Sequence, residues 1–376
     1  MKNHFSSFQG KKVLVTGHTG FKGSWLTAWL LSLGAKVTGI ALPPTKDQKL
    51  FHQLGIEDSI THVAADIRNG EQLSAAIADC EPDYVFHLAA QSLVRQSYDD
   101  PLGTYQTNLL GTVNVLEALR SLKDLYRRRG KICSVVIVTT DKCYENKEKV
   151  QGYREVDPLG GYDPYSASKA CAEIATNSYR QSFFNTGGDV LPSFGIASAR
   201  AGNVIGGGDW AKDRIIPDAI KSLAAGEPIN VRNPSATRPW QHVLEPLSGY
   251  MSLAAKIYHA LENKDEVFLH RFCSAYNFGP ESSANRNVRD LVEVCLAHWE
   301  GSWINASEGS APHEAALLSL VWDKAHSDIG WAPVWSFETA VEKTINWYKQ
   351  DHEETGSAKT LVSEDIISYM ANLDES

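Results

Sequence analysis

The sequence lacks the features that would place it among disulfide-rich, zinc-binding or membrane-spanning proteins. Its six cysteines form no C-x-x-C pair, and its 12 histidines include no H-E-x-x-H spacing, so neither a disulfide framework nor a metal site is expected. No apolar run reaches the roughly 18 residues of a membrane span. The N-terminal segment MKNHFSSFQG has no apolar signal core. These absences predict a cytoplasmic protein in a reducing compartment.

Positive charge is also scarce, since 36 Lys and Arg residues face 45 Asp and Glu residues and leave a net charge of −9. Nucleic-acid and anionic-membrane surfaces need basic patches, so neither partner is expected. The composition, 43% hydrophobic and 22% charged, is ordinary for a soluble globular protein. A chain of 376 residues predicts one large domain or two intertwined ones.

Short apolar runs alternate with amphipathic segments through the first half of the chain. We expect strands at 11–17, 35–42, 83–90 and 134–140, and helices at 24–34 and 108–122. Such alternation is typical of a parallel sheet covered on both faces. It predicts an α/β fold with a doubly wound parallel (Rossmann) sheet and a smaller mixed α/β substrate domain.

The alternation loosens beyond residue 200, which indicates a second, smaller region over the carboxyl edge of the sheet. We expect residues 1–203 plus 237–278 to form the sheet domain, and 204–236 plus 279–376 to form the smaller domain. The polar stretch that follows residue 350 is expected to be peripheral or partly mobile.

Three glycines at three-residue spacing lie between the first expected strand and the first expected helix, in VLVTGHTGFKGSWL. Gly17, Gly20 and Gly23 allow a tight turn and a close approach to a pyrophosphate, which the helix N-terminus would bind. An ordinary strand–helix turn is the alternative. The position of the loop, at the start of the first βαβ unit, favours a dinucleotide cofactor. His18 and Lys22 add positive character to the loop.

The acidic residue that commonly binds the cofactor's ribose is missing. It is expected about 20 residues beyond the glycines, yet no Asp or Glu precedes Asp47. The sequence therefore leaves NAD and NADP both open and indicates unusual ribose anchoring. Asp66 is a candidate for contact with the adenine, with a strand-end cap as the alternative.

Two further groups indicate proton chemistry. Tyr165 is followed four residues later by Lys169, and residues i and i+4 share a helix face. The ammonium would favour the phenolate and can also hold a ribose; a surface pair is the alternative. Thr140, Asp141 and Lys142 follow an expected buried strand and place an acid and a potential base at its end.

Five segments together resemble the extended short-chain dehydrogenase/reductases that act on nucleotide sugars. They are TGHTGFKG (16–23), HLAAQ (87–91), TNLLGTVNVLEA (107–118), YSASK (165–169) and AGNVIGGGD (201–209). The resemblance runs from about residue 10 to about residue 350. It implies that Tyr165 and Lys169 are the catalytic pair and that Thr140 shares the sugar's 4-oxygen.

The resemblance also implies that residues 1–203 plus 237–278 form a dinucleotide-binding domain and residues 204–236 plus 279–376 a nucleotide-sugar-binding domain. It implies in addition which residues bind the two ligands. For the cofactor they are Gly17, His18, Gly20, Phe21, Lys22, Gly23, Asp66, Ile67, Leu88, Ala89, Asn108, Tyr165 and Lys169. For the nucleotide sugar they are Asn203, Arg238 and Asn277 at the diphosphate, together with Arg214 and His313. An arginine suits a diphosphate because its fork pairs two oxygens at once.

The family's 4,6-dehydratases need more than the Tyr-Lys pair. After the hydride at C4 passes to NAD⁺, the 4-ketone acidifies the C5 proton, a base removes it, and an acid helps the 6-hydroxyl leave as water. The hydride then returns to C6. By the resemblance, Asp141 is the acid and Lys142 the base, where relatives acting on dTDP-glucose carry Asp-Glu. With RPWQHV (238–243) and APHEAALLSL (311–320), this pair resembles the CDP-glucose branch.

A base role makes a physical demand on Lys142. Only about one free lysine in a thousand is neutral at pH 7, so burial beside Lys169 and the nicotinamide cation would be needed. A charged Lys142 that stabilises the enolate, with another group or water as base, is the rival role.

Other functions use the same residues. A 4-epimerase, or a 4,6-dehydratase for another nucleotide sugar, would share the scaffold, and a dinucleotide-sensing binding protein would need no catalysis, although such proteins usually lack part of the Tyr-Lys pair. The resemblance implies a homodimer, possibly a tetramer, formed through a four-helix interface of residues 108–119 and 165–179. It also implies a product that feeds deoxysugars of bacterial surface polysaccharide, such as O-antigen.

Overall fold

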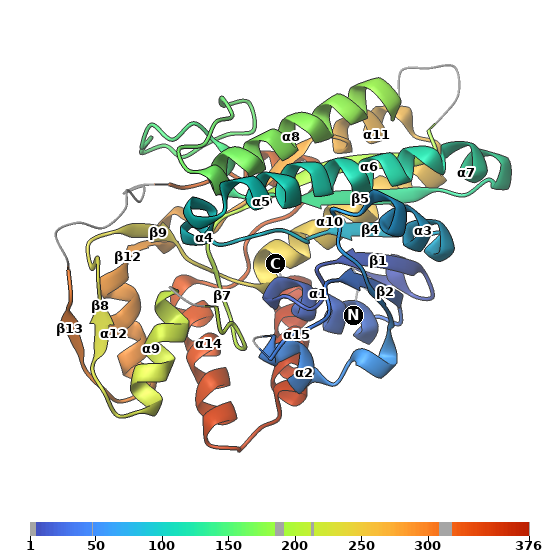
Figure 1. The fold of residues 1–376 in the computed structure, drawn as a ribbon. Coiled ribbons are helices and arrows are strands. Elements are labelled where there is room, and N and C mark those ends of the chain that lie inside the picture. The colour runs from blue at the N-terminus through green and yellow to red at the C-terminus, as the bar shows by residue number, and fades with distance from the viewer. Residues whose placement is uncertain (1–4, 47, 185–191, 212–213, 308–317, 376) are drawn as a thin grey trace.

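A seven-stranded parallel sheet organises the protein (Figure 1). The computed structural model describes residues 5–46, 48–184, 192–211, 214–307 and 318–375. Strand order is β11-β6-β5-β4-β1-β2-β3, with β1 Lys12–Thr16, β2 Lys36–Ala41, β3 Thr61–Ala64, β4 Tyr84–His87, β5 Cys133–Val138, β6 Phe194–Ala201 and β11 Ala275–Phe278. The order reverses between β1 and β4, and in such sheets ligands bind at the carboxyl ends of the strands beside that point.

Helices cover both faces of the sheet, as Figure 1 shows. Their bounds are α1 Phe21–Ser32, α2 Lys49–Leu54, α3 Gly70–Cys80, α4 Val94–Asp99, α5 Pro101–Tyr105, α6 Gly111–Ser121, α7 Lys123–Arg129, α8 Pro164–Phe183, α10 Leu244–Glu262, α11 Glu266–Phe272, α13 Asp323–Ile329 and α15 Ala358–Glu375. Alternation along β1 explains the two layers: Leu14 packs into the cluster with α3 and α6, while Val13 and Val15 pack into the cluster with α1 and α10. The predicted doubly wound α/β class is confirmed.

A smaller group of elements lies at one end of the sheet, on the left in Figure 1. It contains α9 Ile215–Ala224, α12 Val288–His298, α14 Phe337–His352 and the short strands β7 Val204–Ile205, β8 Ile229–Val231, β9 Thr237–Pro239, β10 Gln241–His242, β12 Asn285–Asn287 and β13 Trp303–Asn305. The strands pair as β10-β7, β12-β9 and β13-β8. These small sheets are the mixed α/β part that the sequence predicted.

The prediction of a peripheral or mobile stretch after residue 350 was wrong. The chain forms α15, which contacts α1, α2 and α14. Tyr369 of α15 is fully buried, packs edge-on against Trp29 with 5.8 Å between ring centroids, and donates a hydrogen bond to Glu245 Oε2 at 2.7 Å. The apolar side of this helix therefore completes the core beneath the sheet.

Candidate active site

The glycine loop closes tightly between β1 and α1, against the end of β4. Gly17 has φ +75°, and a Cβ there would lie 2.8 Å from the backbone N and Cα of Ala89. A Cβ at Gly23 would lie 2.1 Å from the carbonyl oxygen of Gly17. Only glycine fits at either place. The structure thus brings the loop and residues 88–89 together at the point where the strand order reverses.

His18 packs against β2, the strand after which the acidic residue that commonly binds the ribose is missing. It is fully buried, its Nε2 lies 2.8 Å from His62 Nδ1, and its ring fills the space left by Gly39. Burial, with a smaller effect of His62, lowers the pKa of His18 to about 4, so the ring is neutral. Its Nδ1 is buried on the side of Gly39 in β2, so the ring packs the loop against the sheet.

The candidate catalytic segment, residues 140–143, begins one residue after the end of β5. Thr140 caps the short turn Asp141–Cys143: its Oγ1 accepts from Lys142 N at 3.3 Å and donates to Asp141 Oδ1 at 2.9 Å. Asp141 is 2% exposed, and a Cβ at Gly202 would lie 3.0 Å from its Oδ2. Lys142 Nζ lies 3.7 Å from Asp141 Oδ1. The segment therefore holds an acidic and a basic group within reach of each other.

Tyr165 and Lys169 reach the same place from the first turns of α8. Asp163 fixes the start of this helix by accepting from Ser166 N at 2.9 Å, with Pro164 at the first position. Burial raises the pKa of Tyr165 to about 12, against a hydrogen bond with Thr140 that lowers it. Burial lowers the pKa of Lys169 to about 8, against the opposing effect of Glu173. Thr140 thus connects Tyr165 with Asp141.

Lys22 of the glycine loop also faces this site. Burial lowers its pKa to about 7, Arg214, Lys169 and Lys142 lower it further, and Asp141 opposes them. Its Nζ lies 5.9 Å from the ring centroid of Tyr250. The loop therefore adds to the acid–base group an amine whose pKa lies near neutrality.

Tyr250 on α10 is a residue that sequence reasoning missed. It is fully buried, and its hydroxyl has no partner in the described part of the chain. Burial, and to a smaller extent the charges of Tyr165 and Asp141, raise the pKa of Tyr250, so Tyr250 lies close to these two residues. Its place inside an apolar helix gave no local indication of this position.

Asp66 and Ile67 follow β3. Asp66 Oδ1 accepts from Arg68 N at 2.9 Å and Oδ2 accepts from Arg68 Nη2 at 2.6 Å. The guanidinium holds the pKa of Asp66 below its usual value. Ile67 is buried against Gly111, where a Cβ would lie 2.5 Å from its Cδ1. The strand-end cap that the sequence offered as an alternative is therefore present.

Asn108, Leu88 and Phe21 support the loop. Asn108 lies in a single π-helical turn, Gln106–Leu110, and its Nδ2 donates to Gln91 O and to Ser168 Oγ, both at 2.9 Å. It thereby ties the residues after β4 to α8. Leu88 packs beside Gly17, and a Cβ at Gly206 would lie 3.2 Å from Phe21 Cζ.

Of the predicted substrate residues, Asn203 lies nearest to the catalytic segment, since its Oδ1 accepts from Lys142 Nζ at 3.4 Å. Arg214 pairs with Asp209 at 2.6 Å and stands close enough to influence Lys22. Arg238 lies on β9, opposite Arg286 of β12, and its Nη1 donates to Thr237 O. The predicted residue His313 lies outside the described residues.

Asn277 does not fit its predicted place at a diphosphate. It is fully buried on β11. Its Oδ1 accepts from Tyr144 OH at 2.7 Å, and its Nδ2 donates to Tyr153 O at 2.9 Å and to Val321 O at 3.2 Å. The whole amide is used inside the protein, so Asn277 joins three segments of the chain and offers no surface to a ligand.

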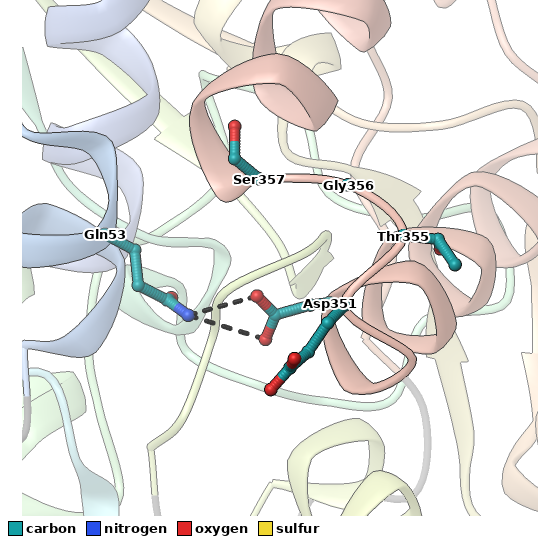
Figure 2. A pocket seen from close by; sticks show the side chains of 6 residues that line it. Gln53, Asp351, Thr355, Gly356 and Ser357 are labelled. Atoms are coloured by element: carbon teal, nitrogen blue, oxygen red, sulfur yellow. Dashed lines mark hydrogen bonds between the residues drawn. The ribbon is translucent and has the colours of Figure 1, made fainter.

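A separate hollow, drawn in Figure 2, lies between α2 and the connection from α14 to α15. Its lining includes Gln53, whose Nε2 donates to Asp351 Oδ1 at 3.1 Å, and none of the catalytic residues. Among the described residues, no group of three or more His, Cys, Asp and Glu side chains could hold a metal ion. No helix in the described ranges is long and apolar enough to cross a membrane.

A glycine loop that opens a doubly wound sheet, with a buried tyrosine and lysine one helical turn apart at the carboxyl ends of its strands, defines an extended short-chain dehydrogenase/reductase. The chain matches the family model described as GDP-mannose 4,6 dehydratase over residues 14–344, and it belongs to that family.

Sequence relatives agree with this assignment, and solved structures share the fold. The chain is 45% identical over 344 residues to CDP-glucose 4,6-dehydratase of Salmonella typhimurium, covering 91% of each chain. It is 27% identical to dTDP-glucose 4,6-dehydratase of Xanthomonas campestris, covering 89% of this chain and 92% of the relative. Its fold is similar to that of epimerase Mth375 of Methanothermobacter thermautotrophicus (TM-score 0.74, 24% identity, 94% and 96% coverage). It is also similar to that of Bacillus anthracis dTDP-glucose 4,6-dehydratase in complex with NAD (0.70, 24%, 91% and 97%).

Proposed function

We propose that this protein is an NAD-dependent CDP-glucose 4,6-dehydratase, which removes water from CDP-glucose to give CDP-4-keto-6-deoxyglucose. The observation that carries the proposal is the meeting of Asp141 and Lys142 with Tyr165 and Lys169 at one strand end, in a chain 45% identical to a CDP-glucose 4,6-dehydratase. An epimerase needs the second pair but has no use for the first.

The glycine loop, His18 and Lys22 are the proposed holders of the cofactor. The close contact of Gly17 with Ala89 suits a dinucleotide at this edge. NAD, when bound, supplies a reversible acceptor for the hydride of C4. The NAD complex of the Bacillus anthracis relative supports this choice.

Tyr165 acts on the sugar's 4-hydroxyl in the proposed mechanism. Its phenolate, which lies in hydrogen-bond contact with Thr140, would take the proton as the 4-oxygen becomes a ketone. A buried phenolate is unfavourable, as the raised pKa of Tyr165 shows. The ammonium of Lys169 on the same helix face offsets that cost.

Asp141 and Lys142 carry the elimination. Lys142, as amine, removes the C5 proton, and Asp141, as carboxylic acid, gives a proton to the departing 6-oxygen. Lys142 Nζ and Asp141 Oδ1 lie 3.7 Å apart, and an ammonium–carboxylate pair differs from this amine–acid pair by the transfer of one proton. The same lysine can return a proton to C5, so C5 ends with a proton exchanged with solvent.

Thr140 links the two residues whose protonation states must be reset after each turnover. Each turnover leaves Tyr165 with one proton from the 4-hydroxyl and Asp141 short of the one that left in water. Thr140 Oγ1 hydrogen-bonds to Asp141 Oδ1 at 2.9 Å and also to Tyr165. It therefore offers a path by which Tyr165 reprotonates Asp141.

The smaller domain and the helices α6 and α8 have proposed roles in substrate binding and in dimer formation. Residues 204–236 and 279–376 would bind the nucleotide sugar, with Asn203, Arg214, Arg238 and His313 as contacts. A homodimer would form through α6 and α8; exposed apolar side chains at Leu102, Leu110 and Ile174 on these and adjoining helices support it. The protein would work in the cytoplasm, in synthesis of deoxysugars for surface polysaccharide such as O-antigen.

Comparing nucleotide sugars tests the substrate. Purified protein with NAD⁺ is incubated with CDP-, dTDP-, UDP- and GDP-linked glucose and with GDP-mannose, and formation of the 4-keto product is followed. We expect CDP-glucose to have the highest kcat/KM. A higher kcat/KM for another nucleotide sugar would contradict the proposed substrate and leave the mechanism unchanged. Formation of a 4-epimer as product would contradict the proposed dehydration.

A further inference from the structure

A buried ion pair lies beside the catalytic segment. Arg200 Nη2 of β6 is 2.8 Å from Glu173 Oε2 of α8, and the two side chains are 4% and 2% exposed. Burial disfavours the charged carboxyl, yet Arg200 and the hydroxyls of Thr139 and Ser198 hold the pKa of Glu173 below its usual value. Burying an ion pair costs desolvation free energy unless further hydrogen bonds satisfy both groups. The residues that supply these hydrogen bonds are therefore held firmly by the pair.

Each half of the pair holds one end of the catalytic segment. Thr139, just before the segment, donates from Oγ1 to Glu173 Oε1 at 2.5 Å. Tyr144, just after it, accepts from Arg200 Nη1 at 2.7 Å, with its ring centroid 4.9 Å from the guanidinium carbon. Residues 140–143, with the proposed acid and base, lie between these two attachments.

The same network reaches the loops beside the site. Tyr144 OH donates to Asn277 Oδ1 at 2.7 Å, and Asn277 holds the backbone at Tyr153 and Val321. One continuous set of hydrogen bonds thus runs from α8 through β6 to β11. The residue that the sequence placed at the diphosphate therefore belongs to this internal network.

We infer that Glu173 and Arg200 form a clamp that sets the position of Asp141 and Lys142. Glu173 holds Thr139 and Arg200 holds Tyr144, which are the residues on either side of the catalytic segment. All four are positioning residues. The inference rests on the proposed function, in which both side chains must meet C5 and C6 of one bound sugar. Proton transfer needs such alignment, and displacement of about 1 Å can cost about 100-fold in rate.

A matched pair of variants separates positioning from stability. Thr139→Val and Ser198→Ala each remove one buried hydroxyl that donates to Glu173, at Oε1 and at Oε2 respectively, but only Thr139 adjoins the catalytic segment. We expect Thr139→Val to lower kcat for CDP-glucose by at least about tenfold with KM within about threefold. Ser198→Ala should keep kcat within about threefold. Tyr144→Phe should behave as Thr139→Val does, because it releases the other end.

Backbone amide hydrogen exchange of the substrate-free protein gives a readout independent of turnover. The amides of Lys142 and Cys143 bond to Thr140 at 3.3 and 3.4 Å. They should exchange faster in Thr139→Val and Tyr144→Phe than in wild type or Ser198→Ala, at comparable thermal midpoints. This pattern in a protein without dehydratase activity would support the clamp and overturn the proposed function.

Two results would overturn the clamp. One is equal behaviour of Thr139→Val and Ser198→Ala, in kcat or in exchange at residues 142–143. The other is a loss of kcat that follows the loss of thermal stability across all three variants, because the network would then only hold the fold together.

Discussion

Asp141 is the residue whose burial and hydrogen bond with Thr140 most clearly mark it for proton transfer. Asp141→Asn keeps its shape and removes its acid. We expect kcat for water loss to fall by about 10²–10⁴-fold, with the Kd for CDP-glucose within about threefold. Product formation and calorimetric binding measure the two effects. Asp124→Asn, at an exposed position on α7, is the control for loss of a carboxylate and should match wild type.

Two substitutions of Lys142 distinguish its role as the C5 base from a role as a fixed positive charge. Lys142→Arg keeps a cation that does not deprotonate in proteins, and Lys142→Met removes both charge and base. Because the proposed mechanism needs an amine at C5, both variants should lose water elimination by about 10²-fold or more. Exchange of the C5 proton with D₂O, followed by NMR, should be lost as well. An arginine variant with near-wild-type turnover would assign Lys142 to enolate stabilisation instead.

Tyr165 acts one step earlier than Asp141. Tyr165→Phe should block oxidation at C4, so mixing with CDP-glucose gives no absorbance of reduced nicotinamide in a single turnover. Asp141→Asn should still give that absorbance, since its block comes later. The same result in the two variants would contradict the division of work between the two pairs.

At the scale of elements, α15 shows why the stretch after residue 350 was misjudged. The segment DHEETGS (351–357) is polar, and the hydrogen-bond partners of Tyr369 lie on α10, more than 100 residues earlier. No local pattern can reveal contacts so distant along the chain. The strands β1, β2, β4 and β5, by contrast, carry their burial in continuous apolar runs, and the sequence located each within a few residues.

The junction between α10 and α15 predicts how stability depends on pH. Glu245 is buried, and burial raises its pKa from 4.5 to about 7, against hydrogen bonds from Trp335 N, Tyr369 OH and Val334 N. Between these pH values the unfolded chain has released a proton that the folded protein keeps. Stability from this residue is therefore full below pH 4.5 and is lost as pH rises through 7.

Glu245→Gln should remove this dependence. The free energy of unfolding of wild type, relative to the variant, should fall by about 3 kcal/mol between pH 4.5 and pH 8. Urea unfolding at several pH values measures it. Glu262→Gln, exposed at the end of the same helix, should parallel wild type throughout. A relative stability that stays constant or rises with pH would show that Glu245 is ionised in the folded protein.

At the scale of the whole molecule, the proposed dimer can be tested with two matched surface changes. Ile174 on α8 and Ile367 on α15 are 58% and 65% exposed. Ile174→Lys should shift the sedimentation coefficient to that of a monomer, because an unpaired charge would be buried in the α6–α8 interface. Ile367→Lys lies outside it and should not. Dimers in both variants, or monomers in wild type, would contradict the proposed interface.

The sequence correctly predicted the sheet and pointed to candidate residues that the structure brings together at its edge, but it did not reveal the buried contacts that support them. The glycine loop, Thr140–Lys142 and Tyr165–Lys169 each occupy a few consecutive residues, and parallel strands bring their carboxyl ends to one edge. Asn277 and Tyr250 depend on contacts between distant segments. Their positions could not be predicted locally, since a buried asparagine on a strand and a tyrosine in an apolar helix look ordinary.

The most direct test is NMR of CDP-glucose incubated in D₂O with the protein and NAD⁺. We predict a C6 methyl signal, a 4-keto or hydrated C4 carbon, and deuterium at C5 as Lys142 exchanges its proton with solvent. CDP-galactose as product, with C5 protonated and the 6-hydroxyl retained, would contradict the dehydratase and leave Asp141 and Lys142 without their proposed roles.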